Sequence, residues 1–196
     1  NLDLSCLKVV LNGGEPIRQT SETLFIEALV PCGMPREVVT HAMGMSESTA
    51  KIITEPIRRF PPKFLSINPK AYEENRVVVV PPGSPNATVV ASNGFTVLDT
   101  EVVIADPHTC HDLGEDRVGE MWVRGTTVAQ GYYNLAEATK TTFHAQLSDG
   151  RCPFLRTGDL AFIHDGEVYL TGRLKDLVII RGQNHHPQDI EWTVLA

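Results

Sequence analysis

The chain has 196 residues, and its 17 Lys and Arg against 24 Asp and Glu give a formal net charge of −7 at pH 7. A net acidic chain lacks the basic stripe that sequence-independent binding to phosphates needs, so nucleic acid is not an expected partner. Hydrophobic residues make up 42% and charged residues 21%, which is typical of a globular protein and argues against bulk disorder. No apolar stretch approaches the roughly 20 residues of a transmembrane helix, so we expect no transmembrane segment.

The chain begins Asn1-Leu2-Asp3-Leu4, without an initiator Met, a basic start or the apolar core of a signal peptide, so we expect a piece of a longer protein. Its cysteines lie far apart and form no C-x-x-C pair: Cys6, Cys32, Cys110 and Cys152. This spacing favours reduced thiols over a zinc site or a disulfide scaffold, and it predicts a cytoplasmic protein.

Residues 1–55 predict an α/β layer. The apolar run Leu7–Leu11 predicts a buried strand that ends in a turn at Asn12-Gly13-Gly14. A second buried strand is expected over Val38–Met43, and strand, helix, strand is the alternation of such a layer. The helix between them is expected to start near Pro16 and to stop at Pro31, with an apolar set of Ile17, Leu24, Phe25, Ala28 and Leu29.

Residues 56–91 differ in composition from what precedes them. The segment contains seven prolines and one strand candidate, Arg76–Val80. Such a segment is typical of a large excursion from a domain, and the alternative is a linker. The four consecutive valines favour a structured insertion that packs against the domain.

Residues 92–174 predict an antiparallel sheet or a small distorted β-barrel. A hairpin turn is expected at His164-Asp165-Gly166, and one helix at about Ala136–Phe143. Another helix is expected to begin at Pro187. From Phe95 onwards, the expected strands are short and evenly spaced: Glu101–Ala105, Glu120–Arg124, Leu160–Ile163, Glu167–Leu170 and, beyond residue 174, Leu177–Ile180.

Seven short motifs follow one another in a fixed order, although each alone is weak. They are Gly13-Gly14-Glu15-Pro16, Met43-Gly44-Met45-Ser46-Glu47, Gly119 to Gly125, Gly131 to Asn134, Arg156-Thr157-Gly158-Asp159, Gly172 to Asp176, and Pro187 to Glu191. This series resembles the adenylate-forming superfamily of acyl-CoA synthetases, adenylation domains and luciferase. The resemblance implies a mixed α/β fold, the end of a large N-terminal domain, with residues 175–196 as the hinge and the start of a C-terminal lid.

The last motifs and the extra segment after Glu47 are similar to the fatty acyl-AMP ligase branch. Members of that branch use ATP and Mg²⁺ to convert a fatty acid into acyl-AMP. The acyl group then passes to an acyl carrier protein, often of a polyketide or peptide synthase, and an insertion at this place is associated with the absence of a coenzyme A step. The resemblance therefore implies a fatty acid substrate and a carrier-protein partner.

The resemblance also implies roles for individual residues. Glu47 corresponds to the Mg²⁺ carboxylate, and a hard cation prefers such an oxygen ligand. Asp159 corresponds to the acid that accepts hydrogen bonds from the two ribose hydroxyls, and Arg173 to the basic residue that reaches the same ribose. Taken singly, Glu47 also fits a solvated helix start, Asp159 a turn, and Arg173 a surface charge on a strand.

Other matched positions would contact the adenine or the hinge. Gly13, Gly14, Glu15 and Pro16 would form one wall of the adenine slot, and Gly44 belongs to the same nucleotide-binding set. Met43 departs from the family, in which an aromatic residue commonly covers the adenine at this position, and a thioether can still contact a ring face. Lys175 corresponds to the hinge that absorbs backbone rotation, with a strand-edge lysine as the alternative.

The remaining conspicuous side chains are expected to be structural. Trp122 and Tyr132-Tyr133 should pack, and neither His41 nor His144 has an identifiable partner. The superfamily's phosphate loop and its lid lysine match nothing in the 196 residues, so we expect no catalytic residue within this chain. Two alternatives stay open: an acyl-CoA synthetase that completes the thioester, and a degenerate, non-catalytic binding module, for which Met43 is the main support.

Overall fold

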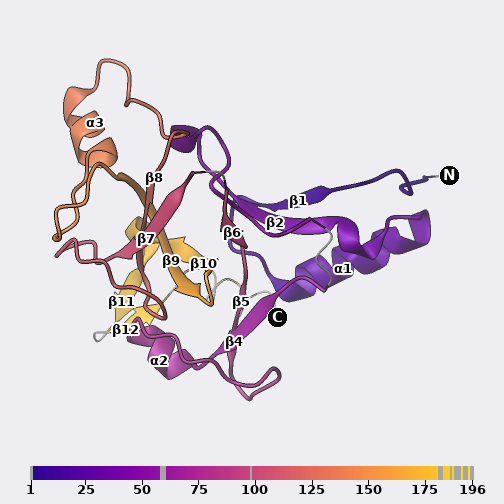
Figure 1. Cartoon of the computed structure of the whole chain (residues 1–196). Helices are drawn as coiled ribbons and strands as arrows, with labels where there is room; N and C mark the ends of the chain where they lie inside the picture. Colours follow the sequence, from indigo (N-terminus) through magenta and orange to yellow (C-terminus); the bar gives the residue numbers. More distant parts are fainter. Residues whose placement is uncertain are drawn as a thin grey trace.

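The computed structural model describes residues 2–57, 61–97, 99–180 and 183–185, together with Pro187, Glu191 and Val194 (Figure 1). Its strands form two four-stranded sheets and two two-stranded pairs in this part of the chain. Both larger sheets meet on a shared apolar core, so the mixed α/β class expected from the sequence is confirmed.

The first sheet has the order β1-β2-β3-β6. β1 (Val10–Gly13) runs parallel to β2 (Val39–Met43), and α1 (Gln19–Leu29) crosses between them, as strand–helix–strand alternation predicts. Two short strands, β3 (Ile53–Thr54) and β6 (Phe95–Thr96), extend the sheet in antiparallel pairing. Single 3₁₀ turns at Val30–Cys32, Arg36–Val38 and Ser46–Ser48 fill the connections.

Two details of this layer correct the sequence prediction. β1 begins at Val10 instead of Leu7 and is not buried, because it is the outer strand of this sheet and Leu11 is 59% exposed. α1 turns Glu22 and Ile26 inward, whereas Leu24 of the expected apolar set is 71% exposed. The buried partner of Glu22 lies on β2, and a helical periodicity cannot register such a distant contact.

The second sheet is antiparallel, with the order β10-β9-β8-β7. Asp165-Gly166 joins β9 to β10 as a two-residue turn with both φ values positive, as the sequence predicts. α3 (Ala136–Phe143) lies between β8 and β9 in sequence and projects away from the sheet (Figure 1). The strands are β7 (Glu101–Ala105), β8 (Gly119–Arg124), β9 (Leu155–His164) and β10 (Glu167–Arg173).

This sheet is open, so the barrel alternative is wrong for the described residues. Its outer strands β7 and β10 do not pair with each other. β10 instead meets the first sheet, where Gly94 forms a bridge with Val168 next to β6. The edge that would close a barrel is therefore occupied by another part of the chain.

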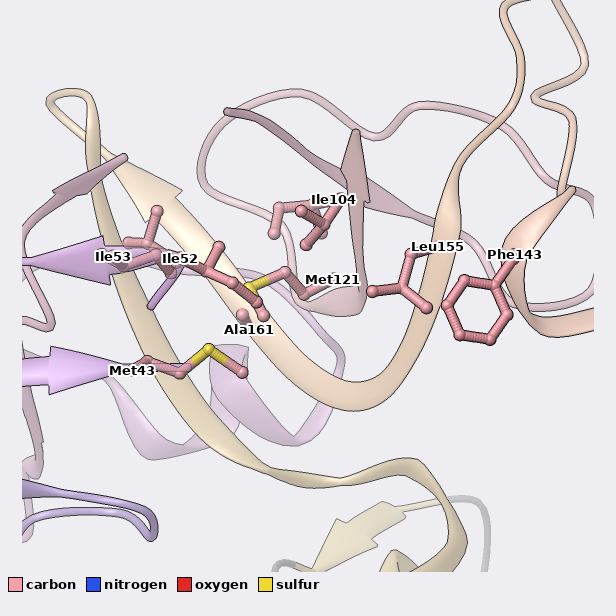
Figure 2. Packing of buried hydrophobic residues seen from close by; sticks show 10 residues of the cluster. Met43, Ile52, Ile53, Ile104, Met121, Phe143, Leu155 and Ala161 are labelled. Carbon is pink, nitrogen blue, oxygen red and sulfur yellow. The ribbon is translucent and has the colours of Figure 1, made fainter. Parts of the chain in front are cut away.

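The main core fills the space between the two sheets (Figure 2). Met43 at the end of β2 lies near Ile52 and Ile53, and Met121 and Ala161 approach from β8 and β9. Leu155 faces Phe143 of α3 at the far end of this cluster. The cluster thus holds the carboxyl end of β2 against the antiparallel sheet.

Residues 61–91 pack on the opposite side of β9 and β10. β4 (Phe64–Ile67) pairs with β5 (Thr88–Ala91), and α2 (Pro69–Glu73) follows β4 with Asn68 as its N-cap. A second apolar cluster joins this segment to the antiparallel sheet: Ile67, Tyr72, Val77, Val90, Val118, Leu160, Phe162 and Tyr169. The treatment of 56–91 as a separate insertion stays a prediction.

The expected strand Arg76–Val80 is wrong. Arg76 and Val79 each make one isolated bridge, to Arg117 and Ile67, and Val78 and Val79 are 44% and 45% exposed. The paired strands of this segment are instead β4 and β5, which the sequence prediction missed. Of the four valines 77–80, Val77 is the one that belongs to the buried apolar cluster.

The final segment contains a 3₁₀ turn, Leu174–Asp176, and a hairpin of β11 (Val178–Ile180) and β12 (Gln183–His185). Asn184 Nδ2 donates to Glu73 O at 3.3 Å and to Asn75 Oδ1 at 3.0 Å, so β12 touches the end of α2. The helix expected from Pro187 falls largely outside the described residues. Within those residues, no helix has the length and apolarity to cross a membrane.

Candidate functional site

An open cavity of about 680 Å³ lies where the loop after β2 faces β9 and β10. It brings together residues that are distant in sequence, among them Gly44, Glu47, Glu120 and Arg173. The rest of its lining is mostly polar: Met45, Ser46, Tyr132, Thr141, Thr142, Arg156, Thr157 and Gly158.

Glu47 enters this cavity from the 3₁₀ turn Ser46–Ser48, directly after β2. A Cβ at Gly44 would lie 1.3 Å from Ala50 O, so glycine is needed for this loop to fold back tightly. Tyr132 Oη donates a hydrogen bond to Glu47 Oε1 at 2.7 Å. This bond and burial raise the pKa of Tyr132, so the phenol stays the donor at neutral pH.

Asp159 and Arg173 face each other across the β9–β10 pair. Arg173 Nε lies 3.0 Å from Asp159 Oδ1, and the Asp159 carboxylate is largely buried while Arg173 is exposed. Burial raises the pKa of Asp159, and Arg173 offsets this only in part, because Glu120 and Glu47 add negative charge nearby. The positive charge of Arg173 therefore does not fully compensate the burial of Asp159 and the negative charges around it.

Glu120 is a site residue that sequence reasoning did not single out. Its carboxylate is 3% exposed and accepts from Arg156 Nη2 at 2.6 Å, from Trp122 Nε1 at 2.9 Å and from Gly158 N at 3.2 Å. These bonds fix the backbone immediately before Asp159. The sequence could have indicated this role, because Glu120 directly precedes the apolar run Met121-Trp122-Val123 of the same strand, and a buried charge requires a partner.

Gly13, Glu15 and Pro16 line a different cavity, of about 490 Å³, between β1 and α1. The structure does not bring them into the cavity of Glu47 and Arg173, although the loops after β1 and β2 leave the same edge of the parallel pair. Gly13 is packed so tightly that a Cβ would lie 2.0 Å from Ala42 O. Gly14 has a φ of +94° and is exposed.

Met43 is 6% exposed and its side chain lies in the core between the sheets (Figure 2). Trp122 is buried as expected, but the packing predicted for Tyr133 is wrong because that side chain is 90% exposed at the tip of a loop. Lys175 is exposed within the turn after β10, and its hinge role stays a prediction. Among the described residues, no three His, Cys, Asp or Glu side chains form a metal-binding group.

These features define a protein of the adenylate-forming type, with an α/β layer against an antiparallel sheet and acidic groups at their junction. The model of one family, the AMP-binding enzymes, matches residues 1–133. The chain therefore belongs to the AMP-binding enzyme family.

Two curated relatives are ligases that act on fatty acids. A medium-chain fatty acid–[acyl-carrier-protein] ligase of Moorena producens is 44% identical over 197 residues, which cover 99% of this chain and 33% of the relative. A long-chain fatty acid–AMP ligase of Mycolicibacterium smegmatis is 36% identical and covers 98% of this chain and 32% of the relative. The chain thus spans about a third of the length of these relatives.

Solved structures of fatty acyl-AMP ligases are also similar to this chain. The crystal structure of a fatty acid AMP ligase from Legionella pneumophila matches with a TM-score of 0.83 and 36% identity, over 99% of this chain and 33% of that one. A fatty acyl-adenylate ligase of that organism, in complex with acyl adenylate and pyrophosphate, also matches with a TM-score of 0.83. The resemblance to fatty acyl-AMP ligases that the motifs predict is confirmed.

Proposed function

We propose that the longer protein to which this chain contributes activates a fatty acid as acyl-AMP and passes the acyl group to an acyl carrier protein. One observation supports this most directly: Glu47 and Arg173, from separate motifs, line one cavity, and Asp159 of a third motif pairs with Arg173 at 3.0 Å. The relatives named above support the fatty acid and the carrier protein, and their lengths leave about two-thirds of the protein outside this chain.

In the proposed reaction, a carboxylate oxygen of the fatty acid forms a bond to the α-phosphorus of ATP. The bond from that phosphorus to the bridging oxygen breaks, and pyrophosphate leaves with the electron pair. The contribution of this chain is to hold the nucleotide in line for that displacement. Asp159 would accept hydrogen bonds from the ribose hydroxyls, and Arg173 would donate to the same sugar and neutralise Asp159.

The donor set suits Mg²⁺. This ion is usually held by one or two carboxylates together with substrate phosphates, not by an all-protein cage. Glu47 supplies one such carboxylate at the cavity wall. Bound there, Mg²⁺ would neutralise charge on the phosphate oxygens, while Tyr132 keeps the Glu47 carboxylate oriented toward the cavity.

The direct test is fatty-acid-dependent release of pyrophosphate by the intact ligase, with product analysis for acyl-AMP. Purified holo carrier protein and coenzyme A are then offered separately as acceptors. Transfer to the carrier protein alone supports the proposal. Efficient acyl-CoA formation would favour the synthetase alternative, and no pyrophosphate release with any fatty acid would favour the non-catalytic module.

We further propose that residues 56–91 restrain the segment after Lys175 and thereby limit the coenzyme A reaction. The contacts of Asn184 with Glu73 and Asn75 support this, as does the packing of Leu174 and Leu177 against the apolar cluster of this segment. A segment in contact with Leu174, Leu177 and Asn184 would oppose rotation of a lid about Lys175.

Replacing residues 68–87 by a short turn should test this restraint, because it retains the β4–β5 pair and removes α2 with its contacts to β12. The expected result is some acyl-CoA product with adenylate formation largely retained. Asn184→Ala is the milder companion variant. A folded, adenylating deletion variant that forms no acyl-CoA at any coenzyme A concentration would contradict this role.

A further inference from the structure

A polar cluster around β2 has not been given a role in the function described above. Its centre is His41 on β2, whose side chain is 0% exposed. We call it the histidine cluster, and its members are Asn12, Glu22, His41, Glu55, Lys63, Ser92 and Glu167.

The contacts of the histidine cluster join the first sheet to α1. Glu22 Oε2 lies 2.7 Å from His41 Nε2 and accepts from Asn12 Nδ2 at 2.9 Å. Asn12 and His41 are direct partners in the parallel ladder, one residue before Gly13 and three before Gly44. One carboxylate oxygen of α1 therefore holds both strands just before the loops that contain Gly13 and Gly44, to which the family resemblance assigns nucleotide contacts.

The same cluster reaches both ends of the 56–91 segment. His41 Nδ1 lies 2.7 Å from Ser92 O and 3.3 Å from Glu55 Oε2, and the His41 amide donates to that carboxylate at 3.1 Å. Ser92 Oγ donates to Glu167 on β10, and Lys63 Nζ lies 2.7 Å from Glu167 Oε1. The segment is thus anchored where it leaves the sheet and where it returns.

The hydrogen-bond partners of the two His41 ring nitrogens indicate the protonation state of the imidazole. Ser92 O only accepts, so Nδ1 must carry a proton. The 2.7 Å between His41 Nε2 and Glu22 Oε2 requires a second proton between them, and because Oε2 also accepts from Asn12, an ionised carboxylate with the proton on Nε2 fits both contacts. Neutral His41 beside ionised Glu22 would place two acceptors at 2.7 Å. The geometry therefore describes an imidazolium flanked by two carboxylates.

Electrostatics agree with this geometry. Burial by itself lowers the pKa of His41, but the hydrogen bond with Glu22 and the charges of Glu55 and Glu22 outweigh it and raise the pKa above the ordinary value. Lys63 and Glu167, the charged groups beyond Ser92, form an ion pair with each other. Glu55 and Glu167 make further contacts in addition to these.

We propose that His41 is a positioning residue of the nucleotide site, which acts as a buried imidazolium that holds the loops after β1 and β2 in place. The inference rests on the proposed function. A group with a raised histidine pKa contributes its full stabilisation below the unfolded pKa of about 6.5 and loses it as pH rises through the folded pKa. ATP affinity should therefore decrease as His41 loses its proton.

Glu22→Gln in the intact ligase tests this while it keeps hydrogen-bonding groups at position 22. A glutamine amide donates to neutral His41 Nε2 while its oxygen still accepts from Asn12, so the cluster needs no imidazolium. ATP affinity of wild type and variant is measured by calorimetry from pH 6 to 9, and their ratio cancels the titration of the nucleotide. The ATP affinity of the wild type divided by that of the variant should fall about tenfold between pH 6 and pH 9, since small displacements of positioned groups have effects of this order.

Histidine ¹⁵N spectra provide a readout that does not depend on nucleotide. Wild-type His41 should have both ring nitrogens protonated at pH 7, and Glu22→Gln should leave only Nδ1 protonated. His144→Gln, a change at an exposed histidine, serves to assign signals and should leave the ratio unchanged. A flat affinity ratio, or a neutral His41 in the wild type, would overturn the inference. If the wild type binds no ATP at any pH, the proposed function fails instead.

Discussion

Two groups of charged residues lie on either side of the loop after β2, and they differ in how their charges are satisfied. In the histidine cluster, His41, Glu22 and Glu55 are sealed from solvent and each contacts protein groups. In the cavity, the Glu47 side chain accepts one hydrogen bond from the described residues, from the Tyr132 phenol, and Arg173, the partner of Asp159, is half exposed. The sealed group can only hold the backbone, whereas the open group has capacity left for a ligand. Substitutions in the histidine cluster should therefore act through stability and through the position of the adjoining loops, whereas substitutions in the cavity should act directly on nucleotide binding and chemistry.

The largest effect should come from Glu47→Gln. Loss of the carboxylate should lower the rate of adenylate formation by about 10²–10³-fold, the order expected when a transition-state charge loses its stabiliser. Stability should change by less than about 0.5 kcal/mol, because the residue is partly exposed and makes one side-chain hydrogen bond. Pyrophosphate release and urea denaturation measure the two quantities. Tyr132→Phe removes only that hydrogen bond and should retain most of the activity.

His41→Gln should have the opposite profile. Removal of the imidazolium leaves the buried Glu22 carboxylate without its cation and takes one charged contact away from Glu55, which should lower the free energy of unfolding by about 3 kcal/mol. Urea denaturation at pH 6 is the measurement, with His144→Gln as the exposed control. A change smaller than that of the control would show that the two carboxylates are satisfied without His41.

Asp159→Asn should separate binding from stability within one residue. ATP affinity should fall about tenfold, because charged hydrogen bonds to the ribose hydroxyls are replaced by neutral ones. Burial raises the pKa of Asp159, so the ionised form is disfavoured in the fold, and the wild type gains stability as pH falls through that pKa. At neutral pH the asparagine variant should be slightly more stable than the wild type. Equal ATP affinity in calorimetry would remove Asp159 from the ribose site.

The smallest effect should come from Glu101→Gln. Glu101 on β7 pairs with Arg124 and Arg151, and all three side chains are more than a third exposed. Solvent screens such pairs, so the free energy of unfolding should fall by less than about 1 kcal/mol. Glu120→Gln on the neighbouring strand β8 is the matched comparison, and its buried carboxylate should make the loss clearly larger. Equal losses in urea denaturation would contradict the role of burial.

Local sequence signals determined much of this protein. The parallel β1–α1–β2 unit, α3 at Ala136–Phe143 and the Asp165-Gly166 turn follow from periodicity and turn chemistry, because each depends on residues close in sequence. The ordered motifs also indicated the family, which the comparisons confirm. These features need no knowledge of which segments meet in space.

Tertiary structure decided the rest. Whether β7–β10 close into a barrel depends on what pairs with the free edge of β10. That edge is bridged at Val168 by Gly94, which lies 74 residues earlier in the sequence. The inward face of α1 is set by the contact of Glu22 with His41, 19 residues away. The burial of the Glu120 carboxylate depends on Arg156, 36 residues away. A buried charge is tolerated only where a distant partner arrives. The amino-acid sequence shows the charge, and only the folded chain shows the partner.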